Sequence, residues 1–152
     1  MYHAIVGRIV RAGFDRLSAG DYSAALAGAA PNVHHVFAGD HPLGGERHSR
    51  DAFRQWFERL FRLFPALRFQ IREVVVKGWP WRTVVAVEWE AHVTPAVGPE
   101  YVNQAAHIIH IRWGRAVYVH AYENSQAVAD ACRHMAANGI EEAAAAPITD
   151  AA

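Results

Sequence analysis

The sequence predicts a single α+β domain in which helices cover one face of a curved antiparallel sheet. Two observations lead to this prediction. Apolar residues recur at helical spacing before residue 65, and strand-like runs separated by turn residues follow it. The chain has 152 residues, of which 52% are hydrophobic, and such a chain can build a core without disulfide staples.

The elements before residue 65 are assigned from apolar spacing and helix-end signals. Gly20-Asp21 stops the first helix and caps a short second one, and Pro31-Asn32 leads into a strand. Ser49 is a suitable N-cap for a third helix, which Pro65 ends. The predicted elements of this half are helices at 4–18 and 21–28, a strand at 33–38 and a helix at 50–64.

The elements after residue 65 are assigned from turn-rich breaks. The segments GWPW, TPAVGPE and WG separate four strand-like runs, and Asn138-Gly139 ends a last helix. We therefore predict strands at 67–77, 83–94, 101–112 and 116–123, and a helix at 125–137. One domain is expected over 1–140, and the Ala-rich segment 141–152 is expected to be a disordered tail.

Composition excludes several classes of partner. The formal net charge is zero, which gives no basic surface for nucleic acid or an anionic membrane. No apolar run approaches the roughly 18 residues of a membrane span, and the first 15 residues lack a signal-peptide layout. The single Cys132 rules out an internal disulfide and fits a reducing compartment. We expect a cytoplasmic protein that binds neither nucleic acid nor membranes.

The stretch FAGDHPLGG places Asp40 between an apolar strand and a tight Pro/Gly turn. In one interpretation, the Asp40 carboxylate accepts backbone N–H groups and only builds the turn. In the other, it is desolvated at the mouth of a pocket and carries a proton near neutral pH. The aromatic helix with Trp56 and Phe57 could supply the apolar wall.

Strand parity suggests a polar face in the second half. One plausible register of the TPAVGPE hairpin places Glu88 opposite His107 and His92 opposite Asn103. The residues that would share this face are Glu88, Glu90, His92, Asn103, His107 and Glu123.

The competing interpretation of strand 83–94 points its apolar set, Val85, Val87 and Trp89, at the helices instead. If the polar set faces inward, a second subunit must cover these apolar residues. They would then share an exposed outer face with Tyr118, His120 and Tyr122.

Cofactor and metal motifs are missing from the sequence. His34 and His35 are adjacent on a strand and therefore point to opposite faces, as do His107 and His110. The sequence has no phosphate-binding glycine loop and no CxxC pair. We expect no cofactor and no metal site.

The element order and the stretches FAGDHPLGGERHSRDAFRQWF and VYVHAYENS resemble the nuclear-transport-factor-like superfamily, in its SnoaL-like polyketide cyclase branch. The resemblance covers about residues 4–135. It implies a cone-shaped, cystatin-like fold with helices on the concave sheet face and a homodimer through the convex face. Asp40 falls where the related steroid delta-isomerases keep a proton-shuttling carboxylate. Phe14 and Ile109 fall near positions where those isomerases have Tyr and Asp, so steroid isomerisation is not expected.

The combined expectation is a cone cavity that binds a small apolar molecule. If the protein is an enzyme, cofactor-free acid–base isomerisation, cyclisation or hydration is expected, with Asp40 and His107 transferring protons and Glu88 orienting His107. The other residues expected to contact the ligand are Phe14, Trp56, Phe57, Glu90, His92, Asn103 and Glu123. The alternatives are a ligand-binding domain without catalysis and a dimeric accessory scaffold.

Overall fold

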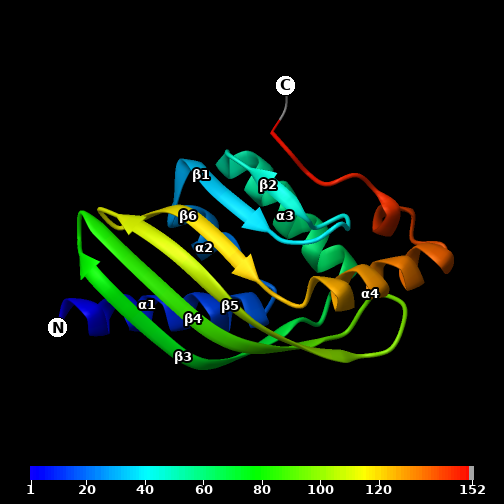
Figure 1. Ribbon diagram of the computed structural model, residues 1–152, viewed down its shortest axis with the longest axis horizontal. Coiled ribbons are helices and arrows are strands. Elements are labelled where there is room, and N and C mark those ends of the chain that lie inside the picture. The colour runs from blue at the N-terminus through cyan, green and yellow to red at the C-terminus, as the bar shows by residue number, and fades with distance from the viewer. Residues whose placement is uncertain (151–152) are drawn as a thin grey trace.

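The computed structural model describes residues 1–150 and confirms the predicted α+β class (Figure 1). The helices are α1 (Tyr2–Ser18), α2 (Ser23–Ala27), α3 (Arg50–Leu63) and α4 (Ser125–Ala137), followed by the 3-10 helix η1 (Glu141–Ala144). The strands are β1 (Ala29–Phe37), β2 (Gly45–Arg47), β3 (Arg68–Trp79), β4 (Arg82–Val93), β5 (Tyr101–Arg112) and β6 (Arg115–Tyr122). Strand β2 and the 3-10 helix η1 are the two elements in this list that the sequence pattern did not predict.

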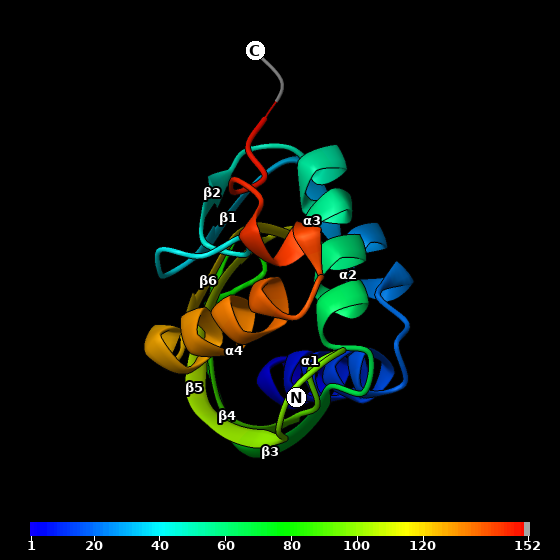
Figure 2. The same cartoon turned by 90° about the vertical axis from the view of Figure 1, so that its right-hand side faces the viewer.

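The strands form one six-stranded sheet in the order β2-β1-β6-β5-β4-β3. Neighbouring strands pair antiparallel except β1 and β6, which run parallel. Figure 2 shows the long strands β3, β4 and β5 curling around α1, with α3 on the same side of the sheet. This curvature creates a concave, helix-covered face and a convex outer face.

Helices α1 and α3 cover the concave face for reasons that are visible in their sequences. The Ser49 hydroxyl accepts a hydrogen bond from the backbone N–H of Ala52 at 3.1 Å and caps α3. The buried stripe of α3 is Phe53, Trp56, Phe57 and Leu60. Helix α1 is tied to the sheet at its C-terminal end, where the Ser18 hydroxyl accepts the N–H of Phe69 at 2.9 Å.

Strand β4 turns its apolar residues toward the helices. Val85 and Val87 are fully buried, whereas Glu88 is exposed. In the observed register, His107 lies opposite Val87, and Glu88 lies opposite Ala106. The predicted Glu88–His107 pairing is therefore wrong by one residue, a slip that reverses every side chain of the strand. Burying a Val-sized or larger apolar side chain contributes about 1.5–3 kcal/mol, which favours this register.

The β5–β6 hairpin differs from its predicted register but keeps the predicted parity. Ile109 pairs with Val119 rather than Val117. One residue of this offset arises at the turn, where Arg112 pairs with Arg115 around a two-residue loop, and the other at an irregularity between His110 and Ile111. Because the shift is two residues, odd-numbered residues of both strands still face the helices along most of the hairpin. His107 and Asn103 therefore point to the concave side, as predicted.

The segment after α4 packs against the domain, where the sequence predicted a disordered tail. Ala143 in η1 is buried, and Glu142 pairs with Arg62 and with Arg59, whose Nε lies 3.3 Å away. The carbonyl of Ile148 accepts a hydrogen bond from Arg47. The buried side chain of Ala143, the ion pairs of Glu142 and the carbonyl of Ile148 thus hold this segment on α3 and β2. Residues 151 and 152 of the predicted tail lie outside the described residues.

Within residues 1–150, no helix has both the length and the apolar character needed to cross a membrane.

Candidate functional site

A cavity of about 510 Å³ lies between the concave sheet face and helices α1 and α3. Its wall is mainly aromatic and aliphatic and includes three residues predicted to contact a ligand, Phe14, Trp56 and Phe57. A volume of about 300–1,000 Å³ with few polar groups is typical of small-molecule sites. The cavity therefore argues against a scaffold with a filled core. Its polar lining residues are Arg16, His35, Tyr101, Asn103 and His107.

His107 is held by Trp89, not by the predicted Glu88. The indole N–H of Trp89 donates to Nδ1 of His107 at 2.7 Å. An indole N–H only donates, so the His107 ring is neutral and carries its proton on Nε2. Burial lowers the pKa of His107 to about 4, with a smaller contribution from nearby His120. At neutral pH this ring is a hydrogen-bond donor and not a cation.

His35 is a second neutral imidazole in the cavity wall. Its Nδ1 lies 2.5 Å from Nη1 of Arg47, which lies directly opposite on β2. Guanidinium nitrogens only donate, so Nδ1 accepts and the ring proton again resides on Nε2. The ring stacks on Phe53 with centroids 4.3 Å apart. Burial, with the Arg47 charge beside it, lowers the pKa of His35 well below its ordinary value.

Arg47 is fully buried and held in place by backbone carbonyls. Its Nη2 donates to Gly44 O at 2.8 Å, and its Nε donates to Ile148 O at 2.9 Å. Burial lowers its pKa to about 10, against the opposing pull of Asp150. With its donors committed in this way, the guanidinium fixes the orientation of His35.

Asn103 lines the cavity near the start of α4, and Glu123, which is not among the lining residues, is close enough to the lining residue Tyr101 to affect its pKa. The Oδ1 atom of Asn103 accepts the backbone N–H of Asn124 at 3.0 Å, which leaves its amide NH₂ as a donor. Both carboxyl oxygens of Glu123 are buried and have no hydrogen-bond partner among residues 1–150. Burial raises the pKa of Glu123 to about 7. Its charge and that of Cys132 add to burial in raising the pKa of Tyr101.

Asp40 lies outside the cavity wall and is exposed. The turn that it enters is built by its neighbour His41, whose Nε2 lies 3.0 Å from Ala38 O and whose Nδ1 accepts the N–H of Leu43. A side chain at Gly44 would meet the carbonyl of Gly39 at 1.9 Å, so glycine is required there. The side chain that builds the FAGDHPLGG turn is therefore the buried His41. Asp40 is exposed to solvent.

The acids and the histidine predicted on β4 lie on the outer face. Glu88 and His92 are exposed. Glu90 accepts from Arg72 at 3.1 Å and from Gln104 at 3.3 Å. The predicted inward polar face is therefore wrong for these three residues, for the register reason given above, while Asn103 and His107 line the cavity.

Three residues of the site were missed by sequence reasoning: His35, Arg47 and Trp89. The alternation of β1 showed that only one of His34 and His35 could face a pocket, without deciding which. Arg47 lies on the unpredicted strand β2, so no pattern connected it with His35. Trp89 was one of the apolar residues whose face the two interpretations left open.

Comparison with known proteins supports the fold and the family. A solved NTF2-like protein of unknown function from Burkholderia pseudomallei has 20% identity and a TM-score of 0.71, covering 81% of this chain and 93% of that one. A structure of TerC co-crystallised with polyporic acid has 21% identity and a TM-score of 0.66, covering 81% and 94%.

A third structure, of a protein from Jannaschia sp. CCS1 provisionally assigned as a SnoaL-like polyketide cyclase, has 15% identity and a TM-score of 0.66, covering 85% and 92%. The curated proteins contain no match. The SnoaL-like domain family matches residues 10–119, and the chain belongs to this family.

Proposed function

We propose that the protein binds a small apolar molecule with a carbonyl or enol oxygen in the cavity. The observation that carries this proposal is the pair of neutral imidazoles, His35 and His107, in an otherwise apolar wall. Each ring has Nδ1 engaged by a donor and therefore offers Nε2–H. Two such donors select a ligand oxygen that accepts hydrogen bonds.

The ligand class follows from the rest of the wall. Phe14, Trp56 and Phe57 supply apolar and aromatic surface, which favours a flat or ring-bearing molecule. Polyporic acid, a diaryl dihydroxyquinone, combines aromatic rings with acceptor oxygens. Its presence in the TerC structure supports the choice of this compound as a probe for the present chain.

A second candidate function is catalysis of enolisation, isomerisation or cyclisation, which Glu123 favours. A neutral N–H donor placed at a carbonyl oxygen stabilises the enolate that forms when a neighbouring carbon loses a proton. With Nδ1 already engaged, neither His35 nor His107 is free to accept that proton. Glu123, with unpartnered oxygens and a pKa near neutrality, is the proposed acceptor. Asp40 and Glu88 have no part in this proposal because both are exposed to solvent, whereas Glu123 is half-buried.

The experiment for binding is a titration with polyporic acid, followed by the fluorescence of Trp56 and Trp89 in the cavity wall. We expect saturable quenching in the wild type. His107→Phe should weaken affinity about tenfold, because one hydrogen bond to the ligand is lost. The matched control is His110→Phe, three residues along β5 on the exposed outer face, which should leave affinity unchanged. No saturation in the wild type, or equal weakening by both variants, would contradict the proposal.

The experiment for catalysis measures deuterium incorporation from D₂O next to the carbonyl of a bound ketone such as 2-tetralone. We expect Glu123→Gln to abolish enzyme-dependent exchange while the ketone still binds. Exchange that persists in Glu123→Gln would rule out Glu123 as the proton acceptor. If the wild type binds the ketone without exchange, the proposed ligand-binding function stands and the proposed catalytic function is wrong.

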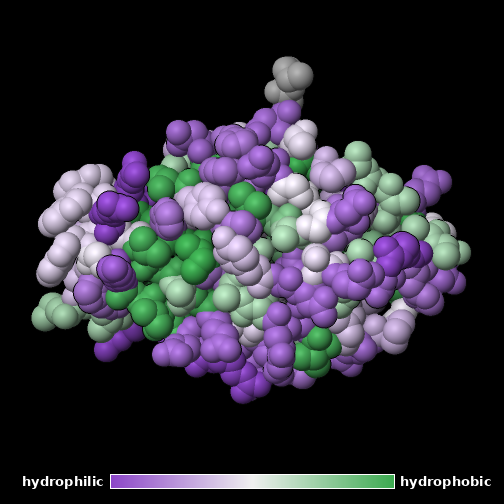
Figure 3. Space-filling view, viewed as in Figure 1, coloured by the Kyte–Doolittle hydropathy of each residue, from purple (hydrophilic) through white to green (hydrophobic). Residues whose placement is uncertain are grey.

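We also propose a homodimer formed through the convex sheet face. Figure 3 shows hydrophobic side chains gathered on the left-hand part of this face, over strands β4, β5 and β6. In the observed parity the half-buried residues there are Val36, Val84, Ala86, Ile108, Tyr118 and His120. Contiguous apolar surface of this kind is typical of subunit contacts. The cytoplasm remains the proposed compartment, supported by the free, buried Cys132.

A further inference from the structure

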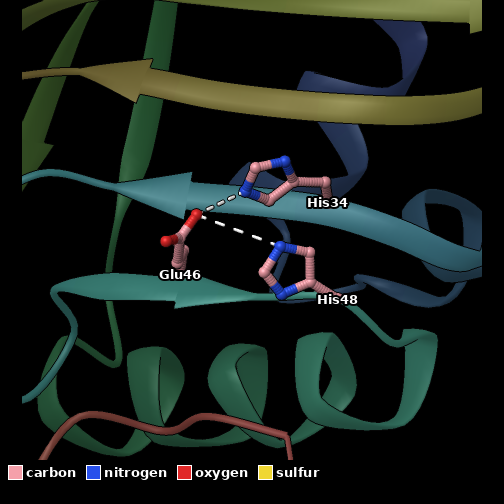
Figure 4. Close-up of side chains that lie close together, drawn as sticks. All are labelled: His34, Glu46 and His48. Atoms are coloured by element: carbon pink, nitrogen blue, oxygen red, sulfur yellow. Dashed lines mark hydrogen bonds and ion pairs between the residues drawn. The ribbon is translucent and has the colours of Figure 1, made fainter.

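A cluster of potential metal ligands lies outside the cavity, on the outer face of the β1–β2 pair (Figure 4). Glu46 Oε2 lies 2.6 Å from Nε2 of His34 and 4.0 Å from Nε2 of His48. The two imidazole rings stack with centroids 4.2 Å apart. Each of the three residues offers one ligand atom, and these atoms all lie within 4.8 Å of one another.

Strand pairing, not sequence spacing, brings these residues together. In the antiparallel β1–β2 pair, His35 lies opposite Arg47, and Val36 lies opposite Glu46. His34 and His48 are the next residues in the same register and face each other just beyond the end of β2. Glu46 is two residues from His48 and therefore points to the same side. The backbone thus holds two imidazoles and one carboxylate in a fixed arrangement.

Asp150 orients one of the two imidazoles. Its Oδ2 lies 3.4 Å from Nδ1 of His48 and accepts the backbone N–H of the same residue at 2.6 Å. A carboxylate on the remote ring nitrogen is the usual support of a metal-bound histidine, because it fixes the tautomer that presents the other nitrogen. In His48 this other nitrogen is Nε2, the atom nearer to Glu46.

We propose that His34, Glu46 and His48 bind a zinc ion. Zinc takes imidazole nitrogen at about 2.0–2.1 Å and carboxylate oxygen at about 2.0–2.2 Å, which places tetrahedral ligand atoms roughly 3.3–3.5 Å apart. The observed separations of 2.6 and 4.0 Å fall on either side of this value, so small side-chain rotations complete the site. Two imidazoles with one carboxylate suit zinc and related late transition ions rather than magnesium or calcium, which prefer oxygen ligands.

The consequence of metal binding is a clamp on the short edge strand. Strand β2 has three residues and pairs only with β1 in the sheet. On its inner face Arg47 contacts His35 in the cavity wall, directly behind the proposed metal ligands. A bound ion would fasten the backbone that carries the Arg47–His35 contact. The inference stands on the outer-face geometry and does not depend on the proposed function of the cavity.

The test is a calorimetric titration of ZnCl₂ into the chelator-treated full chain. We expect one zinc per chain in the wild type, with affinity at least tenfold weaker in His34→Gln and in His48→Gln. His110→Gln, an exposed histidine of the same outer face, is the matched control and should bind as the wild type does. MgCl₂ should give no binding. Equal affinity in the wild type and His48→Gln, or no zinc binding by the wild type, would overturn the proposal.

A second measurement separates a site from nonspecific contact with surface histidines. Zinc should slow amide hydrogen exchange at Glu46 and Arg47 in the wild type and in His110→Gln, but not in His48→Gln. Because the His48 side chain is 58% exposed, its replacement should leave the fold intact, which thermal unfolding without zinc verifies. Zinc that binds without protecting these amides would show an adventitious ion only, and would overturn the site.

Discussion

The indole N–H of Trp89 donates to Nδ1 of His107 at 2.7 Å, between neighbouring strands on the concave face. This contact decides what the histidine can do. With Nδ1 occupied by a donor-only group, the ring stays neutral and offers Nε2–H to the cavity. A tryptophan that sequence patterning treats as core thus sets the chemistry of a polar neighbour.

The Arg47–His35 contact achieves the same result with a different donor. A buried guanidinium and an indole are chemically unlike, yet both occupy Nδ1 and neither accepts a hydrogen bond. The cavity therefore presents two imidazole N–H groups. Buried donors without partners are unfavourable, so ligands that supply acceptor oxygens are selected over hydrocarbons of the same shape.

The first prediction concerns Trp89→Phe. Phenylalanine fills most of the same volume but cannot donate, so the neutral form of His107 loses a hydrogen bond. We expect the pKa of His107 to rise from about 4 by up to about one unit, and stability to fall by about 2 kcal/mol. Histidine ring signals followed by NMR across a pH titration measure the first effect, and denaturant unfolding measures the second.

The sign of the pH dependence follows from the lowered pKa of His107. A histidine that is neutral in the fold contributes stability above its unfolded pKa of about 6.5, and this is lost as the pH falls toward 4. Trp89→Phe should therefore lose less stability on acidification than the wild type. Trp81→Phe, at a 56% exposed tryptophan, is the control, and equal His107 titrations in all three proteins would contradict the proposed role of Trp89.

The second prediction concerns Glu123. Burial raises its pKa to about 7, so the folded state is penalised when the carboxyl ionises. The protonated Glu123 carboxyl therefore costs the folded state nothing below about pH 4.5. As the pH rises through 7 the carboxyl ionises, and the wild type loses stability that Glu123→Gln keeps. We expect Glu123→Gln to be more stable at pH 8 by about 1–2 kcal/mol, after discounting for partial exposure. Chemical unfolding at pH 4 and pH 8 measures this, and Glu141→Gln is the control. A difference of the same size at both pH values would contradict the raised pKa.

The sequence predicted the elements well because their signals are local. Helical spacing, the Ser49 cap and turn-rich breaks each act within a few residues, and eight of the predicted elements lie within a few residues of their observed bounds. The short strand β2 was not predicted because three residues are too few to show a periodic pattern. Its existence depends on pairing with β1, a contact that turn geometry around Gly44 makes possible.

The site was harder to predict because it depends on register. A one-residue change in the β4–β5 pairing exchanges Glu88 for Val87 as the partner of His107. Turn residues alone did not determine that register. The burial of Val85, Val87 and Trp89 determined it, and the alternation of apolar residues was the one signal pointing to the observed arrangement. His35 and Arg47 face each other only because β1 and β2 pair.

The third prediction concerns the outer sheet face. Ile108 lies on this face opposite His120, and a charge there would be buried if a second copy covers it. We expect the wild type to sediment as a dimer at micromolar concentration and Ile108→Glu to sediment as a monomer. The control is Ile5→Glu on α1, at a 46% exposed position away from this face, which should remain dimeric. A monomeric wild type would refute the proposed dimer.

The last prediction concerns two glycines of α1 that differ in their relation to the cavity. Gly13 lines the cavity, whereas Gly7 is not among its lining residues, and a Cβ at either position meets no atom within 4 Å. Leucine favours a helix over glycine by about 0.5–1 kcal/mol, so Gly7→Leu and Gly13→Leu should both raise thermal stability slightly. At Gly13 the new side chain extends into the space proposed for the ligand, and the affinity for polyporic acid should fall at least tenfold. At Gly7 the affinity should not change. If Gly13→Leu binds the probe as tightly as Gly7→Leu, the ligand does not occupy this cavity and the proposed function is wrong. That result would not bear on the zinc site, which the zinc titration tests separately.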